Sequence, residues 1–488
     1  MLRSLTDLGR ARALLLSGVL IFIAAALLVY SQTRAFAWDE GFHLITAQLI
    51  LRGKRPYLDF LFPQTLLNAY WNALWMRVFG ETWRTAHVVA ALGSIAAMLL
   101  TVHYVLRREW APQWRAPLAV FAAITVGLNA PVVQYGTIGQ AYGFCLVLIV
   151  AAFRFGVTAV ARRHWIWAAL SGLFAGAAAG SSLLSAPVAP VLFIWMLVYN
   201  RAGGRVAKAC AFLLALIPPF IPVLWLFAQN PRLTIFNVIS YHLFYRQVQW
   251  PHAIPHDIDV LMSIASSGQA LLLALLAIAG LLYTHYSSGW DRGRRGEMYL
   301  CGWLVVALVV HISSAHPTFP RYYLLTTPFL SIVAAAGLYS VTTRLWSAEH
   351  PWPSVALIAF VFVLGVEQAL YLEREDLTWP YFETVAEKVR EVTPPGASLL
   401  ADEHIYFMLR RVPPTGMELG DSHKLDFSPA FEAWIHAVPD SELRRRLKDG
   451  LYATAETCHD DVIQEVGPDV FAQHADMGNC DVYWSPKK

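Results

Sequence analysis

Acidic residues are scarce in the first three quarters of this chain. Residues 1–372 hold 12 of its 34 Asp and Glu residues, against 25 of its 37 Lys and Arg residues. With 15% charged and 57% hydrophobic residues, the composition excludes an ordinary soluble globular protein. Residues 373–488 instead contain 22 acidic and 12 basic residues and no membrane-length apolar run. The sequence therefore predicts a basic membrane module, 1–372, followed by a small soluble acidic domain, 373–488.

Several motifs of soluble enzymes are also absent. The chain has no phosphate-binding P-loop, no dinucleotide fingerprint and no Ser nucleophile elbow. Its five cysteines show no compact zinc spacing. Its basic residues occur between apolar runs, so they do not form the continuous patch that nucleic acid requires.

Apolar runs long enough to cross a bilayer recur through the module. A hydrocarbon core of about 30 Å needs about 20 helical residues. Eleven such runs are present, with the boundary at Ser181-Ser182 the weakest. They lie at 12–30, 84–106, 116–133, 140–159, 165–183, 185–200, 208–228, 262–284, 297–313, 323–341 and 353–372. We expect an α-helical polytopic membrane protein.

Basic residues between the runs predict the orientation. They gather at the N-terminus and in alternate loops, as at Arg107-Arg108, Arg162-Arg163 and Arg294-Arg295. Because such clusters stay on the cytoplasmic side, we expect the N-terminus inside, and the first loop (31–83) and the C-terminus outside. Ala35-Phe36-Ala37 resembles a signal-peptide cleavage site, but the preceding apolar stretch is long for a signal peptide.

The C-terminal residues are expected to form a small α/β domain. Cys458 and Cys480 lie in it, and disulfides persist outside the cytoplasm, so we predict that these two cysteines are bonded. The predicted helices and strands are helices 380–392, 403–411 and 441–449, and strands 397–401, 451–455 and 481–484.

Two adjacent carboxylates, Asp39 and Glu40, follow the first apolar run directly. Charge near hydrocarbon is costly, so an ionisable pair at a membrane boundary suggests a functional site. Two short helical patterns, 41–51 and 64–75, follow in the same loop. Both are too short to span a membrane, and we expect them to be surface helices.

The first loop then carries a longer pattern, Gly53-Lys54-Arg55-Pro56-Tyr57-Leu58-Asp59-Phe60-Leu61-Phe62-Pro63-Gln64. An acidic pair, a surface helix and this segment resemble the first-loop signature of the GT-C superfamily of membrane glycosyltransferases. The branch it resembles contains protein mannosyltransferases and bacterial lipid A aminoarabinose transferases. The resemblance covers about residues 1–345, with a weaker similarity at 320–328. It implies a bundle of about eleven to thirteen spans and inverting transfer of a sugar from a polyprenyl phosphate.

Sugar transfer from a phosphate ester needs a base that deprotonates the acceptor hydroxyl. A partly buried carboxylate suits this role, because burial raises its pKa. The resemblance assigns the role to Asp39, with Glu40 as a second catalytic candidate that orients it. Both acids could instead cap the surface helix. His43 lies four residues after Asp39, on the same helix face, where it could orient the carboxylate, contact phosphate or bind a metal.

Several cations are candidates for binding the donor phosphate. The guanidinium fork of Arg matches phosphate, and Arg321-Tyr322 lies at the outward end of the tenth run. Arg321 could instead extend to the lipid head groups. The other candidates are Lys54 and Arg55 in the first loop, and His242, Tyr245 and Arg246 in a second long outward loop, 229–261.

One acidic residue that the resemblance implies is missing from this chain. Many relatives carry a second carboxylate between the third and fourth spans, where this chain has none in residues 134–142. A divalent metal ion is a candidate cofactor. The missing carboxylate puts this metal dependence in doubt. Gln140 could supply the hydrogen bonds of the missing carboxylate, and Asp257 or Asp259 could supply its negative charge. Asp59 is a further candidate, for which we favour a structural role.

The sequence therefore predicts an inverting glycosyltransferase in a bacterial inner membrane. Its partners would be membrane lipids, a polyprenyl-phosphate sugar donor and a lipid, glycan or protein acceptor facing outward. A lipid-linked glycan transporter is an alternative, although transporters usually place ionisable residues within their spans. An O-antigen-type polymerase or ligase is another, supported by the Arg and His of the second long loop. The C-terminal domain could select the acceptor, or it could be a passive domain that only packs against the rest of the protein.

Overall fold

The computed structural model describes residues 8–108, 110–245, 252–287, 289–374, 377–425, 427–458 and 460–487. The chain divides into two compact units. The first, here the helical unit, contains Met1–Gln32, Val88–Ile221 and His252–Arg374. The second, here the mixed unit, contains Thr33–His87, Pro222–Pro251 and Glu375–Lys488. The first loop thus packs in the same unit as the C-terminal residues, although the sequence grouped it with the apolar runs.

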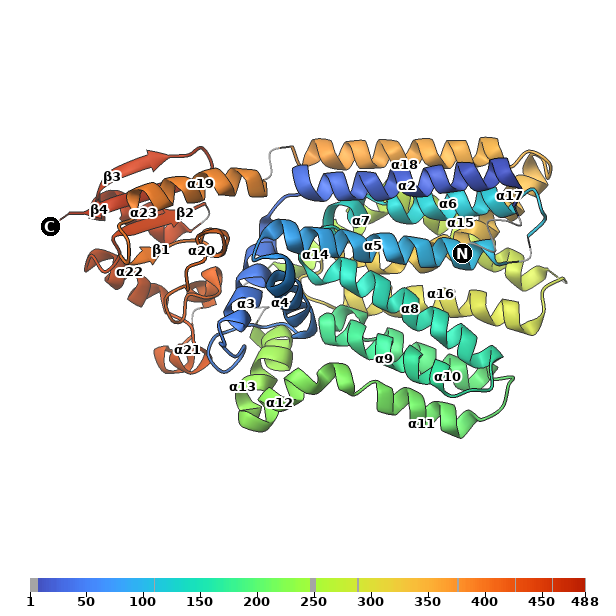
Figure 1. The fold of residues 1–488 in the computed structure, drawn as a ribbon, viewed down its shortest axis with the longest axis horizontal. Coiled ribbons are helices and arrows are strands. Elements are labelled where there is room, and N and C mark those ends of the chain that lie inside the picture. Colours follow the sequence, from blue (N-terminus) through green and yellow to red (C-terminus); the bar gives the residue numbers. More distant parts are fainter. Residues whose placement is uncertain are drawn as a thin grey trace. The chain divides into compact units, whose positions relative to one another are not determined.

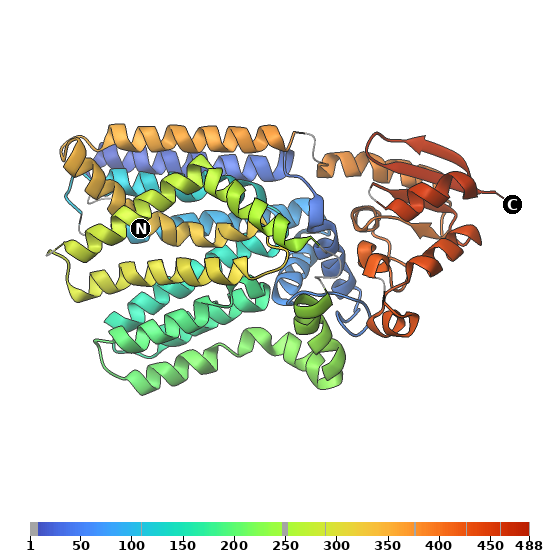
Figure 2. The same ribbon diagram turned by 180° about the vertical axis from the view of Figure 1, so that it is seen from behind.

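The helical unit is built from helices, most of them long (Figures 1 and 2). They are α2 (Arg10–Thr33), α5 (Trp83–Leu106), α6 (Arg115–Gly127), α7 (Ala130–Tyr135), α8 (Ala141–Ala161), α9 (Ile166–Ser181), α10 (Val188–Tyr199), α11 (Arg205–Ala215), α14 (Ala253–Ser266), α15 (Gly268–Tyr286), α16 (Arg292–Ser313), α17 (Thr327–Leu345) and α18 (Trp352–Leu372). Short 3₁₀ turns η2 (Leu183–Ser185), η3 (Pro218–Phe220) and η5 (Pro320–Thr326) connect some of them.

Eight helical stretches of the described residues are long and apolar enough to cross a membrane. Three further predicted spans correspond to shorter apolar helices, Arg115–Gly127, Ile166–Ser181 and Leu183–Tyr199. Large apolar side chains such as Phe22 and Phe360 are exposed on this unit, which suits contact with lipid. The chain is therefore a multi-pass integral membrane protein.

Two predicted spans differ from the structure. The run 116–133 is not one helix, because α6 ends at Gly127 and the chain is extended at Asn129 before α7. The run 262–284 starts too early, because the extended residue Ser267 separates α14 from α15. Apolar composition alone does not reveal such breaks. The prediction of a second long loop at 229–261 was also wrong, because much of this segment is helical.

The mixed unit combines short helices with one sheet. Its helical elements are η1 (Trp38–Glu40), α3 (Gly41–Leu51), α4 (Leu67–Phe79), α12 (Ile221–Gln229), α13 (Pro231–Ile235), the π-helix η4 (Phe236–Tyr245), α19 (Trp379–Val392), α20 (Glu403–Leu409), η6 (Gly420–Leu425), α21 (Pro429–Ile435), α22 (Asp440–Lys448) and α23 (Asp461–Val470). Its strands are β1 (Leu399–Leu400), β2 (Thr454–Thr457), β3 (Phe471–Asp476) and β4 (Asp481–Pro486).

The sheet has the strand order β1-β2-β4-β3. β1 runs parallel to β2, and β4 runs antiparallel to both β2 and β3. The predicted α/β class is confirmed, and Cys458 and Cys480 form the predicted disulfide. The strand expected at 451–455 lies instead at Thr454–Thr457. β3 was not predicted, because most of its side chains are exposed and show no apolar alternation.

The first-loop helix α3 lies in the core of the mixed unit. Leu44–Leu49 are all buried, so this helix lacks the single apolar face of a surface helix. It packs against α20, and Ile45 and Leu49 share one core with Ile405 and Tyr406. The second helix expected in the loop, at 64–75, is α4, which begins at Leu67 and continues to Phe79. Long-range packing therefore stabilises the part of the chain that carries the acidic pair.

Candidate active site

Asp39 and Glu40 lie in η1, a single 3₁₀ turn between α2 and α3 in the chain. Neighbouring residues of such a turn point about 120° apart, so the two carboxylates meet different surroundings. Asp39 is half-buried, whereas Glu40 has no exposed surface. The accessible acid of the pair is Asp39.

Glu40 is held by two ring N–H groups within the mixed unit. Its Oε2 lies 2.8 Å from Nε2 of His87, which is also fully buried, and accepts a hydrogen bond of 2.7 Å from Nε1 of Trp379. His87 donates in the tautomer with its proton on Nε2. The indole of Trp379 stacks on that of Trp83. Glu40 is thus a buried anchor of the turn, which fits the orienting role that the sequence suggested for it.

Other contacts hold the same turn from the C-terminal part of the chain. The Ala37 N–H donates to the Leu377 carbonyl at 2.9 Å, and Nε2 of His404 donates to the Ala37 carbonyl at 3.0 Å. The His404 ring stacks on Phe382 at 4.4 Å. A Cβ atom on Gly41 would lie 2.8 Å from this ring, so only glycine fits there.

Replacing Gly41 with Ala should therefore destabilise the mixed unit by about 1–3 kcal/mol, the usual cost of overpacking. Thermal unfolding of the purified protein in detergent measures this. Gly18→Ala is the matched control, because a Cβ atom there meets nothing within 4 Å and alanine is the better helix former. Equal melting temperatures for the two variants would contradict the tight fit at Gly41.

The two phosphate-binding candidates of the first loop, Lys54 and Arg55, are paired with carboxylates. Arg55 contacts both oxygens of Asp59, at 2.9 and 3.2 Å, and its backbone N–H donates to the same carboxylate at 2.7 Å. These hydrogen bonds hold the pKa of Asp59 below its ordinary value. Nζ of Lys54 lies 3.4 Å from Oε1 of the buried Glu418. Asp59 therefore closes the loop, and phosphate would have to compete with these acids for Lys54 and Arg55.

The rest of this loop is also internally bonded. Tyr57 is fully buried with a positive φ of 70°, a conformation that non-glycine residues rarely adopt. Its hydroxyl donates to the Gln64 carbonyl at 2.5 Å. The Phe62 N–H donates to Oδ1 of Asn237 at 2.9 Å, which ties the loop to η4. Surrounding contacts thus impose one conformation on the segment.

The remaining candidates of the mixed unit are two histidines and Arg246. His43 is half-buried, with its ring 4.1 Å from that of Phe42 and 6.2 Å from that of Phe62. His242 is half-buried on η4 beside Tyr241. Arg246 lies outside the described residues. His43 therefore has an aromatic environment, which the sequence did not suggest.

A second cluster of predicted residues lies in the helical unit. Arg321 and Tyr322 are buried on η5, and the guanidinium of Arg321 lies 4.3 Å from the centroid of Phe319. The Tyr322 ring contacts Tyr142, at the start of α8, at 6.3 Å. Gln140, which precedes α8, is also buried. The structure thus brings Arg321 and Tyr322 to the same end of α8 as Gln140.

Asp257 holds the loop that leads to η5. Its Oδ1 accepts the Thr318 N–H at 2.7 Å, and its Oδ2 lies 2.5 Å from Nδ1 of His316. Nε2 of the neighbouring His256 lies 3.0 Å from the Thr318 carbonyl. These bonds use both oxygens of Asp257, so its role here is to position the loop before Arg321. Asp259 is exposed on the same helix.

One group of possible metal ligands occurs in the described residues. Atoms of Glu456, Cys458 and Cys480 lie within 4.8 Å of one another. Both sulfurs belong to the disulfide, however, and zinc binds cysteine as the thiolate. This group therefore does not fit a metal in the oxidised protein.

Glu456 of this group should make stability depend on pH. Burial, and then the charge of Asp402, raise its pKa well above the ordinary value of 4.5. The folded state favours the neutral form of Glu456, which is lost as pH rises from about 4.5 through the raised pKa of the folded state. Ionisation of this buried carboxyl then lowers the stability of the fold. We expect Glu456→Gln to melt at a higher temperature than the wild type at pH 8, and at the same temperature at pH 4. Thermal scans at the two pH values measure this, with the exposed Asp449→Asn as control. No gain at pH 8 would contradict the assignment.

Sequence reasoning missed the residues that hold the acidic turn, namely His87, Trp379 and His404. His87 was detectable as an ionisable residue near the start of an apolar run. Trp379 and His404 follow Glu40 by more than 330 residues, and no local pattern links residues so far apart.

The sequence matches no protein-family model and no curated protein. The fold, however, is similar to crystal structures of ArnT from Cupriavidus metallidurans. The structure bound to undecaprenyl phosphate matches with a TM-score of 0.68 and 16% identity, over 97% of this chain and 99% of that one. The apo structure matches with a TM-score of 0.70 and 16% identity, over 96% and 99%. The chain therefore has an ArnT-like fold.

Proposed function

We propose that this protein is a membrane glycosyltransferase that uses a polyprenyl-phosphate sugar as donor. The main support is the similarity of its fold to ArnT over almost the whole of both chains, since ArnT has been crystallised with undecaprenyl phosphate. The different surroundings of Asp39 and Glu40 add to this. One carboxylate is accessible and the other is a buried anchor, an arrangement that leaves a single acid for proton transfer.

In the proposed reaction, Asp39 accepts the proton of the acceptor hydroxyl. The acceptor oxygen attacks the anomeric carbon, and the bond from that carbon to the phosphate oxygen breaks with inversion. The bonding pair leaves with the polyprenyl phosphate, whose added negative charge Arg321 stabilises. The products are the glycosylated acceptor and the polyprenyl phosphate, and the proton on Asp39 passes to solvent. We place the reaction at the outward face of a bacterial inner membrane, following the distribution of Lys and Arg.

The test is sugar transfer from a panel of radiolabelled polyprenyl-phosphate sugars, in membranes that contain the full chain. Transfer to a lipid, glycan or protein fraction above that of membranes without the protein would support the proposal and identify the sugar. A parallel arm with a chelator measures metal dependence. Lack of transfer from every donor, with folded protein present, would overturn the proposal.

Substitution of Arg321 should weaken donor use selectively. Loss of a hydrogen bond to a charged group costs about 1.5–3 kcal/mol, so Arg321→Gln should lower kcat/KM for the donor by about 10–100-fold. Arg321→Lys should recover only part of this, because lysine lacks the planar fork. Kinetics with each substrate varied in turn measure the effect. Arg344→Gln, an exposed arginine near the end of α17, is the matched control. An unchanged donor KM and kcat in Arg321→Gln would exclude the phosphate-binding role.

A further inference from the structure

A groove runs along the outer surface of the helical unit between α15 and α16, two helices in contact with one another. Its volume is about 390 Å³. Gly302 faces the Leu281 side chain, from which a Cβ atom would lie 3.4 Å away, at ordinary van der Waals contact, so only a larger side chain there would fill the groove. The side chains of Leu282 and Trp303 are more than half exposed, so the groove opens away from the bundle. Its main lining residues are Leu281, Leu282, His285, Tyr299, Gly302 and Trp303.

The groove has one polar end. Nδ1 of His285 lies 3.2 Å from the hydroxyl of Tyr299. Arg295 precedes Tyr299 by four residues and therefore lies on the same face of α16. One guanidinium nitrogen of Arg295 donates to the Ser287 carbonyl at 2.6 Å. Its Nε is buried without a hydrogen-bond partner among the described residues. Donors for an anion thus gather where the apolar lining ends.

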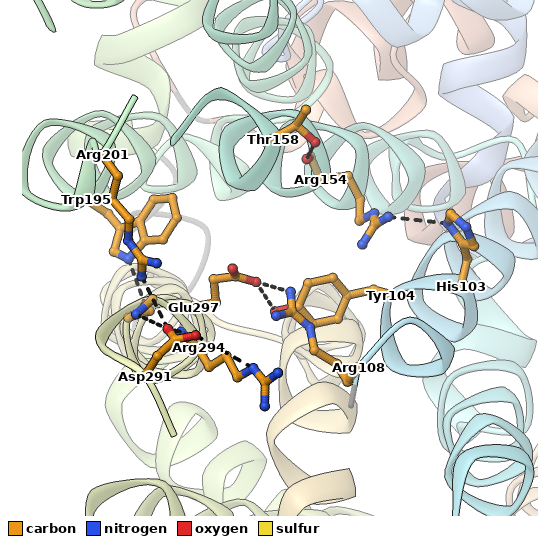
Figure 3. A network of polar contacts seen from close by, with 12 residues as sticks. His103, Tyr104, Arg108, Arg154, Thr158, Trp195, Arg201, Asp291, Arg294 and Glu297 are labelled. Carbon is orange, nitrogen blue, oxygen red and sulfur yellow. Dashed lines mark hydrogen bonds and ion pairs between the residues drawn. The ribbon is translucent and has the colours of Figure 1, made fainter. Parts of the chain in front are cut away.

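Three arginines of the helical unit that Figure 3 labels have carboxylate partners. Arg108 pairs with Glu297, whereas Arg201 and Arg294 both approach Asp291. Among the residues that the structure describes, Arg295 has no acidic partner. The positive charge at this end of the groove is therefore available to an anionic ligand.

We infer that the groove binds one anionic phospholipid. An acyl chain fills the apolar part, and the phosphodiester accepts hydrogen bonds from Arg295 and Tyr299. The guanidinium fork matches a phosphate, and a lipid supplies both the hydrocarbon and the negative charge from the surrounding bilayer. This site is additional to the proposed sugar transfer and does not depend on it.

Native mass spectrometry of the full chain in detergent tests the inference, with phosphatidylglycerol and phosphatidylcholine of identical acyl chains as probes. We expect one retained phosphatidylglycerol in preference to phosphatidylcholine. Arg295→Gln should lower this preference about fivefold, the effect of about one basic residue at an anionic head group. Gly302→Leu should fill the groove and lower retention about tenfold, as expected if two methylene groups lose their contacts.

Two variants serve as matched controls. Gly18→Leu adds the same side chain where a glycine of α2 has open space, and Arg162→Gln removes an exposed arginine of a different loop. Both should retain the lipid like the wild type. Equal retention of the two lipids, or full retention by Arg295→Gln and Gly302→Leu, would overturn the inference. Displacement of phosphatidylglycerol by equimolar undecaprenyl phosphate would overturn the assignment to a phospholipid.

Discussion

Asp39→Asn is expected to lower kcat for sugar transfer by about 10²–10⁴-fold, the usual contribution of a general base. Asparagine keeps the size of the side chain but cannot accept the proton of the acceptor hydroxyl. The half-buried position of Asp39 in η1 leaves it able to meet a substrate, which the buried Glu40 cannot do. Transfer measured at saturating donor and acceptor isolates the effect on kcat.

Two further measurements make this expectation specific. The melting temperature of Asp39→Asn should stay close to that of the wild type, since the anchor described above uses contacts of Glu40 and Ala37. Asp449→Asn, an exposed acid at the end of α22, should keep full activity. Full transfer by Asp39→Asn would remove Asp39 as the base and, with it, the residue assignments taken from the first-loop resemblance.

Glu40→Ala is expected to destabilise the mixed unit by about 3 kcal/mol or more. Its removal leaves the buried N–H groups of His87 and Trp379 without their acceptor, and each unsatisfied donor costs about 1–3 kcal/mol. Glu40→Gln keeps an acceptor oxygen and should lose less. Thermal unfolding in detergent, followed through tryptophan fluorescence, measures both variants.

A surface pair supplies the control for this substitution. Glu391 is exposed on α19 and meets only Lys388 of the same helix among the described residues, so Glu391→Ala should cost less than about 1 kcal/mol. Glu40→Ala should also lower kcat, because Asp39 would lose its fixed position, while Glu40→Gln retains more activity. Equal melting temperatures for Glu40→Ala and Glu391→Ala would refute the anchor.

Adjacent carboxylates with different tasks are a common arrangement in enzymes, because the environment and not the residue type sets the role. Here the turn itself separates the two side chains. Glu40 points into a core of aromatic rings, which His404 and Phe382 continue, and Asp39 points elsewhere. These surroundings support the resemblance, which assigns the general base to Asp39 and an orienting role to Glu40.

The sequence by itself determined the class of this protein. Apolar runs about 20 residues long predict spans wherever they occur, because the bilayer sets the required length. The acidic pair and the loop pattern after it indicated a resemblance to GT-C enzymes, and the two cysteines of the acidic domain indicated a disulfide. Each of these inferences uses residues close together in the chain, or a property that does not depend on the position of other segments.

Only the tertiary structure revealed the surroundings of the candidate site residues. Glu40 meets His87 and Trp379, which follow it by 47 and 339 residues, and Arg55 meets Asp59 instead of remaining open to phosphate. Whether a carboxylate is a base or an anchor depends on which donors and how much apolar surface surround it. The neighbours of Glu40 are brought together by packing of distant segments, a long-range effect that local sequence patterns do not encode.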